Sequence, residues 1–136
     1  MPFRRLIDSG IASVMTAHLL IPALDDSQPA TLSHAVLTDL LRSELGFTGL
    51  VVTDALVMEA ISRTTGPGEA AVQAFAAGAD LILMPADADA AIDAICAALA
   101  EGRIPESRLH ESLKRRTEAL HRCVKPCFSA IEVELE

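Results

Sequence analysis

Three short runs of apolar residues recur along the chain, each closed by a residue that ends a strand. They occupy residues 12–17, 50–53 and 81–84, and the last two consist mainly of leucine, isoleucine and valine. Continuous apolar runs of this length are typical of strands buried on both faces of a sheet. The pattern therefore predicts three buried strands, with a proline-containing loop over residues 21–30 after the first one.

Between and after these strands, apolar residues repeat at spacings of three and four, which is the pattern of one helix face. Ser33 is a good N-cap for the first of these stretches, and Gly46 is a good C-terminal stop. Gly78 closes a later stretch in the same way. The predicted helices span residues 33–45, 55–61, 69–77, 87–101 and 106–122.

Strands that alternate with amphipathic helices predict the α/β class with a parallel sheet. An open sheet and a portion of a (β/α)8 barrel are equally compatible with this order of elements. A complete barrel needs about 250 residues, so a chain of 136 residues holds about three βα units of one. We expect this domain to cover residues 1–122. Residues 123–136 have no clear pattern and are expected to form a tail or linker.

Composition narrows the classes of function. The formal net charge of −8 disfavours nucleic acid and anionic membrane as partners. Three cysteines, without a second pair nearby, form neither a disulfide framework nor a zinc site, and we expect no metal and no cofactor. No apolar run reaches the roughly 18 residues of a membrane span, and no signal-peptide pattern opens the chain. We therefore expect a cytoplasmic protein.

Active-site residues of parallel α/β proteins gather where the strands end. In this chain the three strand ends lie at His18, Asp54 and Pro85. Only Asp54 places a carboxylate directly after a strand, where a rigid turn would present it as a nucleophile. The alternative role of Asp54 is to act as the N-cap of the short helix predicted to follow it.

Three other aspartates are expected to have structural roles. Asp25 and Asp26 lie in the proline-containing loop and are expected to form turns. Asp80 precedes the third strand, which places it at the end of the sheet opposite to Asp54. In barrels that end serves stability rather than chemistry.

The segment around Asp54 resembles a family motif. Residues 46–58 read GFTGLVVTDALVM, which resembles the nucleophile segment G-F-x-G-x-V-x-[ST]-D of family 3 glycoside hydrolases. Residues 14–25 (VMTAHLLIPALD) and 29–33 (PATLS) resemble the β-N-acetylhexosaminidase branch of that family. The resemblance covers about residues 2–120, and it implies the C-terminal part of a (β/α)8 barrel.

The resemblance implies a retaining glycosidase that acts on β-linked amino sugars, with Asp54 as its nucleophile. A second group has to protonate the leaving oxygen and later activate water. In this branch that group is a histidine in a K-H-F-P-G-H-G-like segment, which this sequence does not contain.

Two further residues are candidates for contact with the substrate. His18 falls in the A-H-[VIL] run of the family at a strand end, from which it would line the sugar pocket. Its alternative role, a hydrogen-bonded histidine at the rim of the barrel, fits the match better. Met58 follows the nucleophile segment, with core packing as its default role and pocket lining as the alternative.

The match begins at Pro2, inside what looks like a helix, so we expect the chain to be a fragment of a barrel domain. Unpaired strand edges then favour self-association through the exposed barrel edges. Three functions stay open at this point. They are a hexosaminidase-like domain with a carbohydrate substrate, a domain with β-glucosidase-type specificity, and a catalytically silent α/β fragment.

Overall fold

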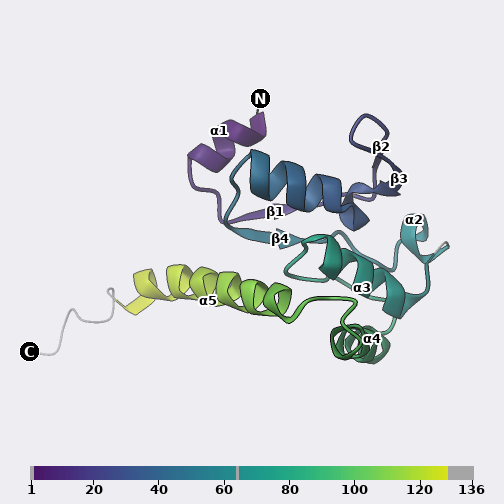
Figure 1. Ribbon diagram of the computed structural model, residues 1–136. Helices are drawn as coiled ribbons and strands as arrows, with labels where there is room; N and C mark the ends of the chain where they lie inside the picture. The colour runs from purple at the N-terminus through teal and green to yellow at the C-terminus, as the bar shows by residue number, and fades with distance from the viewer. Residues whose placement is uncertain (1, 64, 129–136) are drawn as a thin grey trace, which may run out of the picture.

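The computed structural model describes residues 2–63 and 65–128 of a mixed α/β protein. Short strands and helices follow one another along the chain (Figure 1). In order, the elements are α1 (Pro2–Asp8), β1 (Ser13–Met15), β2 (Leu20–Ile21), β3 (Asp25–Pro29), η1 (Ala30–Leu32), η2 (Ala35–Glu44), β4 (Leu50–Val52), α2 (Glu59–Ser62), α3 (Pro67–Ala77), α4 (Ala88–Ala100) and α5 (Glu106–Phe128).

Strands β1 and β4 are parallel neighbours, as predicted for the first two apolar runs. Their register pairs Ser13 with Leu50 and Met15 with Val52. Val51, in the middle of β4, is fully buried, whereas Met15 is 61% exposed. The prediction of a buried strand is therefore confirmed for the centre of β4 and wrong for β1. The reason is that β1 is an outer strand of this sheet among the described residues, and its face around Met15 is uncovered.

The third apolar run, residues 81–84, joins the same sheet more loosely than predicted. Only Leu81 forms a parallel bridge, with Val52 of β4. Beyond this bridge, the carbonyls of Leu83 and Met84 accept hydrogen bonds from the turn after β4 instead of from a strand. The predicted third strand is reduced to one bridge because its partner turns away and Met84 adopts a left-handed backbone conformation, with a φ of 41°.

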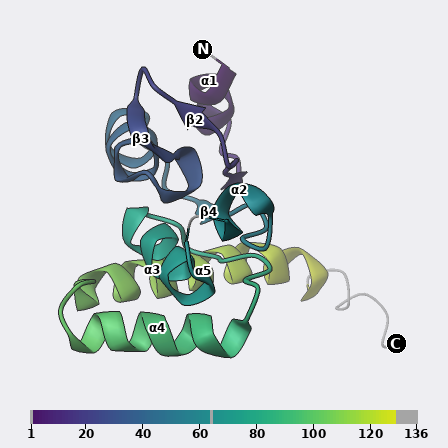
Figure 2. The same cartoon turned by 90° about the vertical axis from the view of Figure 1, so that its right-hand side faces the viewer.

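The stretch predicted as a loop folds instead as a short antiparallel hairpin, β2–β3, with a shift in register. In Figure 2 this hairpin stands at the end of the molecule opposite to α4. Oδ1 of Asp25 accepts the N–H groups of Ser27 (2.9 Å) and Gln28 (3.1 Å) and so forms a local turn within β3, where the register shifts. The loop prediction is wrong because Pro22 lies in the connection between the two strands and Pro29 is the last residue of β3, two positions where a missing N–H donor is tolerated.

The π-helix η2 corresponds to the first predicted helix. The hydroxyl of Ser33 accepts the N–H of Val36 at 3.2 Å just before the helix, and Gly46 follows its end with a φ of 71°. Leu37 and Leu41 on its apolar side are buried in the main core, which they share with β4 and α3. Both end signals read from the sequence are confirmed.

Helices α3 and α4 pack closely against each other (Figure 2). Gly78 ends α3 with a φ of 131°, and the side chain of Asp87 caps α4 by accepting the N–H of Ala90. A Cβ added at Gly68 would lie only 2.9 Å from the Cβ of Ala94. The close approach of the two helices therefore depends on small residues at this contact.

Helix α5 lies below β4 in the view of Figure 1 and contacts that strand. The last predicted helix, residues 106–122, is confirmed, and the helix continues to Phe128. The expected boundary at residue 122 thus falls inside α5, and residues 129–136 of the expected tail lie outside the described residues. Within the described part of the chain, no helix has the length and hydropathy needed to span a membrane.

Candidate active site

The ends of β1, β4 and the third apolar run meet at one edge of the sheet. Because these segments are parallel, their carboxyl ends point the same way. The N–H of Thr16 donates to the Val52 carbonyl at 2.8 Å, and the N–H of Thr53 donates to the Leu81 carbonyl at 3.0 Å. These hydrogen bonds keep the three segments together up to the edge where the site was predicted.

Asp54 is half-buried directly after β4. Its Oδ1 accepts the N–H of Ala55 at 2.8 Å, and no partner of Oδ2 is found among the described residues. Residues 55–58 form a turn closed by a hydrogen bond from the Met58 N–H to the Ala55 carbonyl (3.1 Å). Helix α2 begins only at Glu59, so the prediction of a helix from residue 55 is wrong. The alternative role of Asp54 as an N-cap is wrong for the same reason.

The turn that carries Asp54 is anchored to the third apolar run on both sides. Thr53, which is fully buried, accepts the N–H of Leu83 on its Oγ1 at 2.9 Å. On the other side of Asp54, the N–H of Leu56 donates to the Leu83 carbonyl at 3.0 Å. The carboxylate is therefore presented from a fixed backbone, as the role predicted for it would require.

His18 follows β1, and both of its ring nitrogens have protein partners. Nδ1 lies 2.9 Å from Oγ1 of Thr31, and Nε2 lies 2.9 Å from the carbonyl oxygen of Ala55. Thr31 is fully buried and also bonds Oγ1 of Thr16 at 2.8 Å. This geometry is that of a hydrogen-bonded histidine at the rim, and it joins β1 to the turn after Asp54.

Met58 ends the same turn and is 45% exposed. Core packing, its default role, is wrong because the turn brings the side chain to the surface ahead of α2. Contact with a substrate stays a prediction for both Met58 and His18.

Sequence reasoning missed Thr16 and Thr31, which hold the ring of His18. Thr16 and His18 lie in the stretch after β1, whereas Thr31 belongs to η1, and only the fold joins Thr31 to the other two. The one signal available in the sequence is their position inside the two family-like runs, residues 14–25 and 29–33.

A pocket of about 520 Å³ opens beside His18, between the β2–β3 hairpin and the helices α2 and α3. Its walls include His18, Leu20, Gln28, Leu32 and Gln73. Asp54 does not line this pocket, and none of the side chains that do is acidic. The pocket therefore lacks the carboxylate that the predicted chemistry needs.

Asp25 belongs to the hairpin and not to a catalytic pair. Its Oδ2 accepts the Ser33 hydroxyl at 2.6 Å, and its Oδ1 accepts the Ser27 hydroxyl at 2.7 Å. These bonds, together with those from the N–H groups of Ser27 and Gln28, hold the pKa of the Asp25 carboxyl well below its usual range. The turn-forming role expected for Asp25 is confirmed.

The opposite end of the strands holds a buried cluster of charges. Asp80, whose side chain is fully buried, bonds Arg42 at 2.5 Å and both Arg108 and Arg115 at 3.2 Å. It also accepts the N–H of Val51 at 3.0 Å. Burial lowers the pKa of the Arg42 and Arg108 guanidinium groups, and the negative charge of Asp80 opposes that shift. The cluster ties η2 and α5 to β4, which confirms the structural role expected for Asp80.

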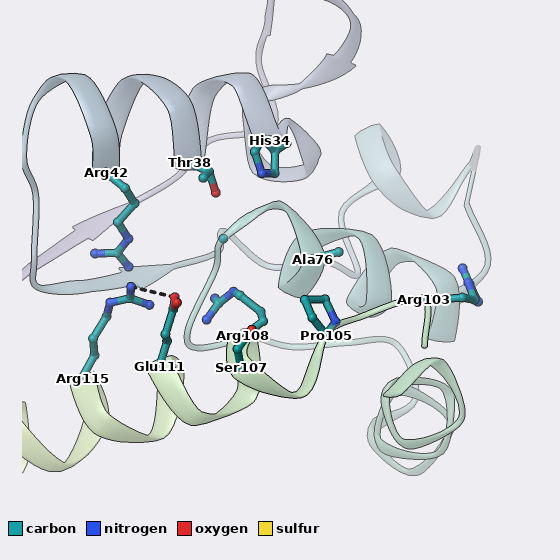
Figure 3. A pocket seen from close by; sticks show the side chains of 11 residues that line it. His34, Thr38, Arg42, Ala76, Arg103, Pro105, Ser107, Arg108, Glu111 and Arg115 are labelled. Carbon is teal, nitrogen blue, oxygen red and sulfur yellow. Dashed lines mark hydrogen bonds and ion pairs between the residues drawn. The ribbon is translucent and has the colours of Figure 1, made fainter. Parts of the chain in front are cut away.

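These three arginines also line a pocket of about 370 Å³ between η2 and α5 (Figure 3). In Figure 3, Arg42 extends from η2 toward Arg115 of α5, which pairs with Glu111 at 3.2 Å. Asp80 and Glu111 pair with these three arginines, and Arg103, which also lines the pocket, pairs with Glu69. The pocket lies at the end of the strands where barrels carry stability and not chemistry. Neither here nor elsewhere in residues 2–63 and 65–128 does a group of three or more His, Cys, Asp or Glu side chains form a possible metal site.

Comparison with known proteins identifies the relatives of this chain. The model of the glycosyl hydrolase family 3 N-terminal domain matches residues 1–119. A β-hexosaminidase of Chromobacterium violaceum is 44% identical over 114 residues, which are 84% of this chain and 31% of that protein. A β-hexosaminidase of Nitrosomonas eutropha is 42% identical over 90 residues, which are 66% of this chain and 26% of that protein.

A solved structure gives the same result. The family 3 β-N-acetylglucosaminidase from Paenibacillus sp. superposes with a TM-score of 0.85 at 50% identity, and the match covers 89% of this chain and 24% of that one. This chain thus spans less than a third of the length of each of these relatives. Because the family model covers most of its residues, the chain belongs to glycosyl hydrolase family 3.

Proposed function

We propose that the chain supplies the nucleophile segment of a retaining β-N-acetylhexosaminidase, with Asp54 as the nucleophile. One observation carries this proposal. Asp54 stands directly after β4, at the edge where the parallel strands end, on a turn anchored to the third apolar run. The names of the relatives from Chromobacterium violaceum and Nitrosomonas eutropha support a β-linked amino sugar as the substrate.

In this mechanism the Asp54 carboxylate attacks the anomeric carbon while the bond to the leaving oxygen breaks. The leaving oxygen takes a proton from a second group, which then activates the water that hydrolyses the glycosyl-enzyme. The hydrogen bond from the Ala55 N–H occupies Oδ1 of Asp54. Oδ2 is thereby left to form the bond to the sugar.

The proton donor has to come from outside this chain. The ring nitrogens of His18 are bound to Thr31 and Ala55, and the Asp25 carboxylate is fully engaged in its hairpin. The histidine segment expected from the resemblance is absent from the sequence. We therefore propose that turnover requires the rest of the family domain.

The architecture supports the same view. We propose that residues 1–122 form about three βα units of an incomplete (β/α)8 barrel. Three parallel segments follow one another along the chain as β1, β4 and the run that begins at Leu81, with helices between and after them. The short share of each relative's length that this chain covers agrees with an incomplete barrel.

A catalytically silent α/β fragment is the second candidate. The observation that favours it is the separation of Asp54 from the pocket beside His18, since that pocket has no acidic lining residue. A chain of this kind would fold without turning over any glycoside. A β-glucosidase-type specificity differs only in the sugar, and the same assay decides it.

The test is a chimera in which this chain replaces the matching stretch of the Chromobacterium violaceum β-hexosaminidase. We expect the chimera to hydrolyse a chromogenic N-acetyl-β-glucosaminide faster than the corresponding β-glucoside. Asp54→Asn should lower kcat by about 10³-fold or more, because it removes the nucleophile. The isolated chain should be inactive toward both glycosides.

Asp87→Asn is the matched control, because Asp87 also follows a strand-like run but caps α4. This variant should keep the kcat of the chimera. A chimera in which Asp54→Asn retains the original rate would overturn the proposal. Hydrolysis of the β-glucoside alone would replace the amino-sugar specificity with the alternative one.

A further inference from the structure

We infer that His18 is a positioning residue, which holds the turn after Asp54 through the Ala55 carbonyl instead of binding the sugar. The inference rests on the proposed role of Asp54 as nucleophile and assigns His18 a task in the same site. Its starting point is that His18, from the end of β1, reaches across to the backbone that follows β4.

The hydrogen bonds of His18 fix the position of its ring hydrogen. A carbonyl oxygen only accepts, so Nε2 carries the hydrogen that is donated to Ala55. In the neutral ring Nδ1 then accepts the hydroxyl hydrogen of Thr31, and the Thr31 oxygen accepts that of Thr16. The chain of donors thus runs in one direction, from Thr16 through Thr31 and His18 to the Ala55 carbonyl.

The other neutral tautomer does not fit this site. It would point the lone pair of Nε2 at the carbonyl oxygen of Ala55, at a distance of 2.9 Å. The hydroxyl groups of Thr16 and Thr31 are buried, and a buried polar group without a partner is costly. Both hydroxyl groups keep a partner in either tautomer, because a hydroxyl can donate or accept. The Ala55 carbonyl, which only accepts, therefore selects the tautomer with the hydrogen on Nε2.

The Ala55 carbonyl is the point at which the turn is held. It accepts two hydrogen bonds, one from Nε2 of His18 (2.9 Å) and one from the N–H of Met58 (3.1 Å). The N–H of the same peptide, that of Leu56, donates to the Leu83 carbonyl at 3.0 Å. This peptide is therefore fixed from the β1 side by His18 and from the third apolar run by Leu83.

Fixing this peptide also fixes the direction of the Asp54 carboxylate. The preceding N–H, that of Ala55, donates to Oδ1 of Asp54 at 2.8 Å, so a movement of Ala55 moves the carboxylate. A nucleophile displaced by about 1 Å loses much of its rate. Since both nitrogens of His18 are engaged, the ring has none left for a sugar hydroxyl.

Two substitutions distinguish the roles of the two ring nitrogens of His18. In His18→Gln the side-chain amide reaches the place of Nε2, whereas in His18→Asn it reaches only the place of Nδ1. The inference predicts that glutamine restores the bond to Ala55 and that asparagine keeps only the bond to Thr31. If His18 served only to bond the buried pair Thr16 and Thr31, His18→Asn would preserve the original behaviour better than His18→Gln.

The first measurement needs no catalytic activity. In ¹⁵N NMR spectra of this chain at about pH 8.5, above the usual titration range of histidine, His18 should show the hydrogen on Nε2. Amide exchange of Leu56 and Met58 should be about fivefold faster in His18→Asn and near the original rate in His18→Gln. The amide of Ile104, in a separate core cluster, should be unchanged in both variants.

The second measurement uses the chimera with the Chromobacterium violaceum enzyme. His18→Asn should lower kcat roughly ten- to hundred-fold with little change in KM, and His18→Gln should recover most of the loss. A hydrogen on Nδ1, or a His18→Asn variant that raises KM alone, would overturn the inference in favour of a sugar contact. An inactive wild-type chimera with the expected tautomer and exchange rates supports the positioning and contradicts the proposed function.

Discussion

The carboxyl group of Asp25 couples the stability of the β2–β3 hairpin to pH. The Ser33 hydroxyl first, and the Ser27 hydroxyl next, hold the pKa of Asp25 well below its ordinary value. A carboxyl whose pKa is lower in the folded than in the unfolded state stabilises the fold at pH values above its unfolded-state pKa, which is about 3.9. This contribution is lost as the pH falls toward the pKa of the folded state. We therefore expect Asp25→Asn to lower the melting temperature by several degrees at neutral pH.

The same substitution should flatten the acid-induced loss of stability, because the titrating group is gone. Thermal melts followed by circular dichroism between about pH 7 and about pH 2 measure both effects. Asp26→Asn is the matched control, since Asp26 is its exposed neighbour. A melting temperature for Asp25→Asn that falls with acid as steeply as that of the original chain would contradict the expectation.

At the scale of single residues, the sequence was sufficient to place Asp54 directly after a strand and insufficient to describe its surroundings. A carboxylate directly after a strand can be recognised from the sequence alone, because the strand and the residue are consecutive. The partners of His18 lie 13 and 37 residues away, at Thr31 and Ala55, and only the fold brings them together. The N-cap alternative for Asp54 could be rejected only once residues 55–58 were seen to form a turn.

At the scale of elements, the contact between α3 and α4 gives a direct test of packing. A Cβ at Gly68 would lie 2.9 Å from the Cβ of Ala94 and 3.0 Å from the carbonyl oxygen of Ala90. Gly68→Ala should therefore reduce the free energy of unfolding by about 1–3 kcal/mol, in spite of the higher helix propensity of alanine. Urea denaturation followed by circular dichroism measures this difference.

Gly66→Ala provides the control for that measurement. Gly66 precedes α3 with a φ of −61°, and nothing lies within 4 Å of a Cβ added there. This variant should stay within about 0.5 kcal/mol of the original chain. Equal stabilities for the two variants would show that the helices can move apart at Gly68 without cost.

The helices were more predictable than the strands for a physical reason. A helix buries one face of its side chains, and local residues set its ends. The helix ends at Ser33, Gly46 and Gly78 could therefore be predicted without knowing what packs against the helices. A strand depends on its neighbours, and the run beginning at Leu81 keeps only one bridge because its partner turns away at Asp54. The hairpin was missed because β2 is only two residues long and β3 is polar with no alternating pattern.

At the scale of the whole molecule, the two ends of the strands serve different purposes. At one end Asp80 and three arginines join η2 and α5 to β4 in a buried network of ion pairs. At the other end Asp54 and His18 lie on turns, and the side chains of Met15 and Met84 stay 61% and 66% exposed. The cluster at the first end holds the fold, which leaves the second end and its apolar side chains open to another surface.

This open end leads to a prediction about assembly. Strand β1 pairs only with β4 among the described strands, so its other edge offers unpaired N–H and C=O groups next to the exposed Met15. Such an edge is a template for pairing with a second chain. We expect the isolated protein to self-associate, with a molecular mass in light scattering after size exclusion that exceeds one chain and rises with concentration.

A charge on the edge strand should oppose this association, because pairing would bury it. Met15→Lys is therefore expected to shift the protein toward the monomer at equal concentration. Ile92→Lys is the matched control, since Ile92 is similarly exposed but lies on α4, away from the strand edges. If Ile92→Lys dissociated the assembly as well as Met15→Lys, general apolar exposure would be its cause. If the original chain were monomeric at all concentrations, its edge would be protected in some other way, and the expectation of self-association would fail.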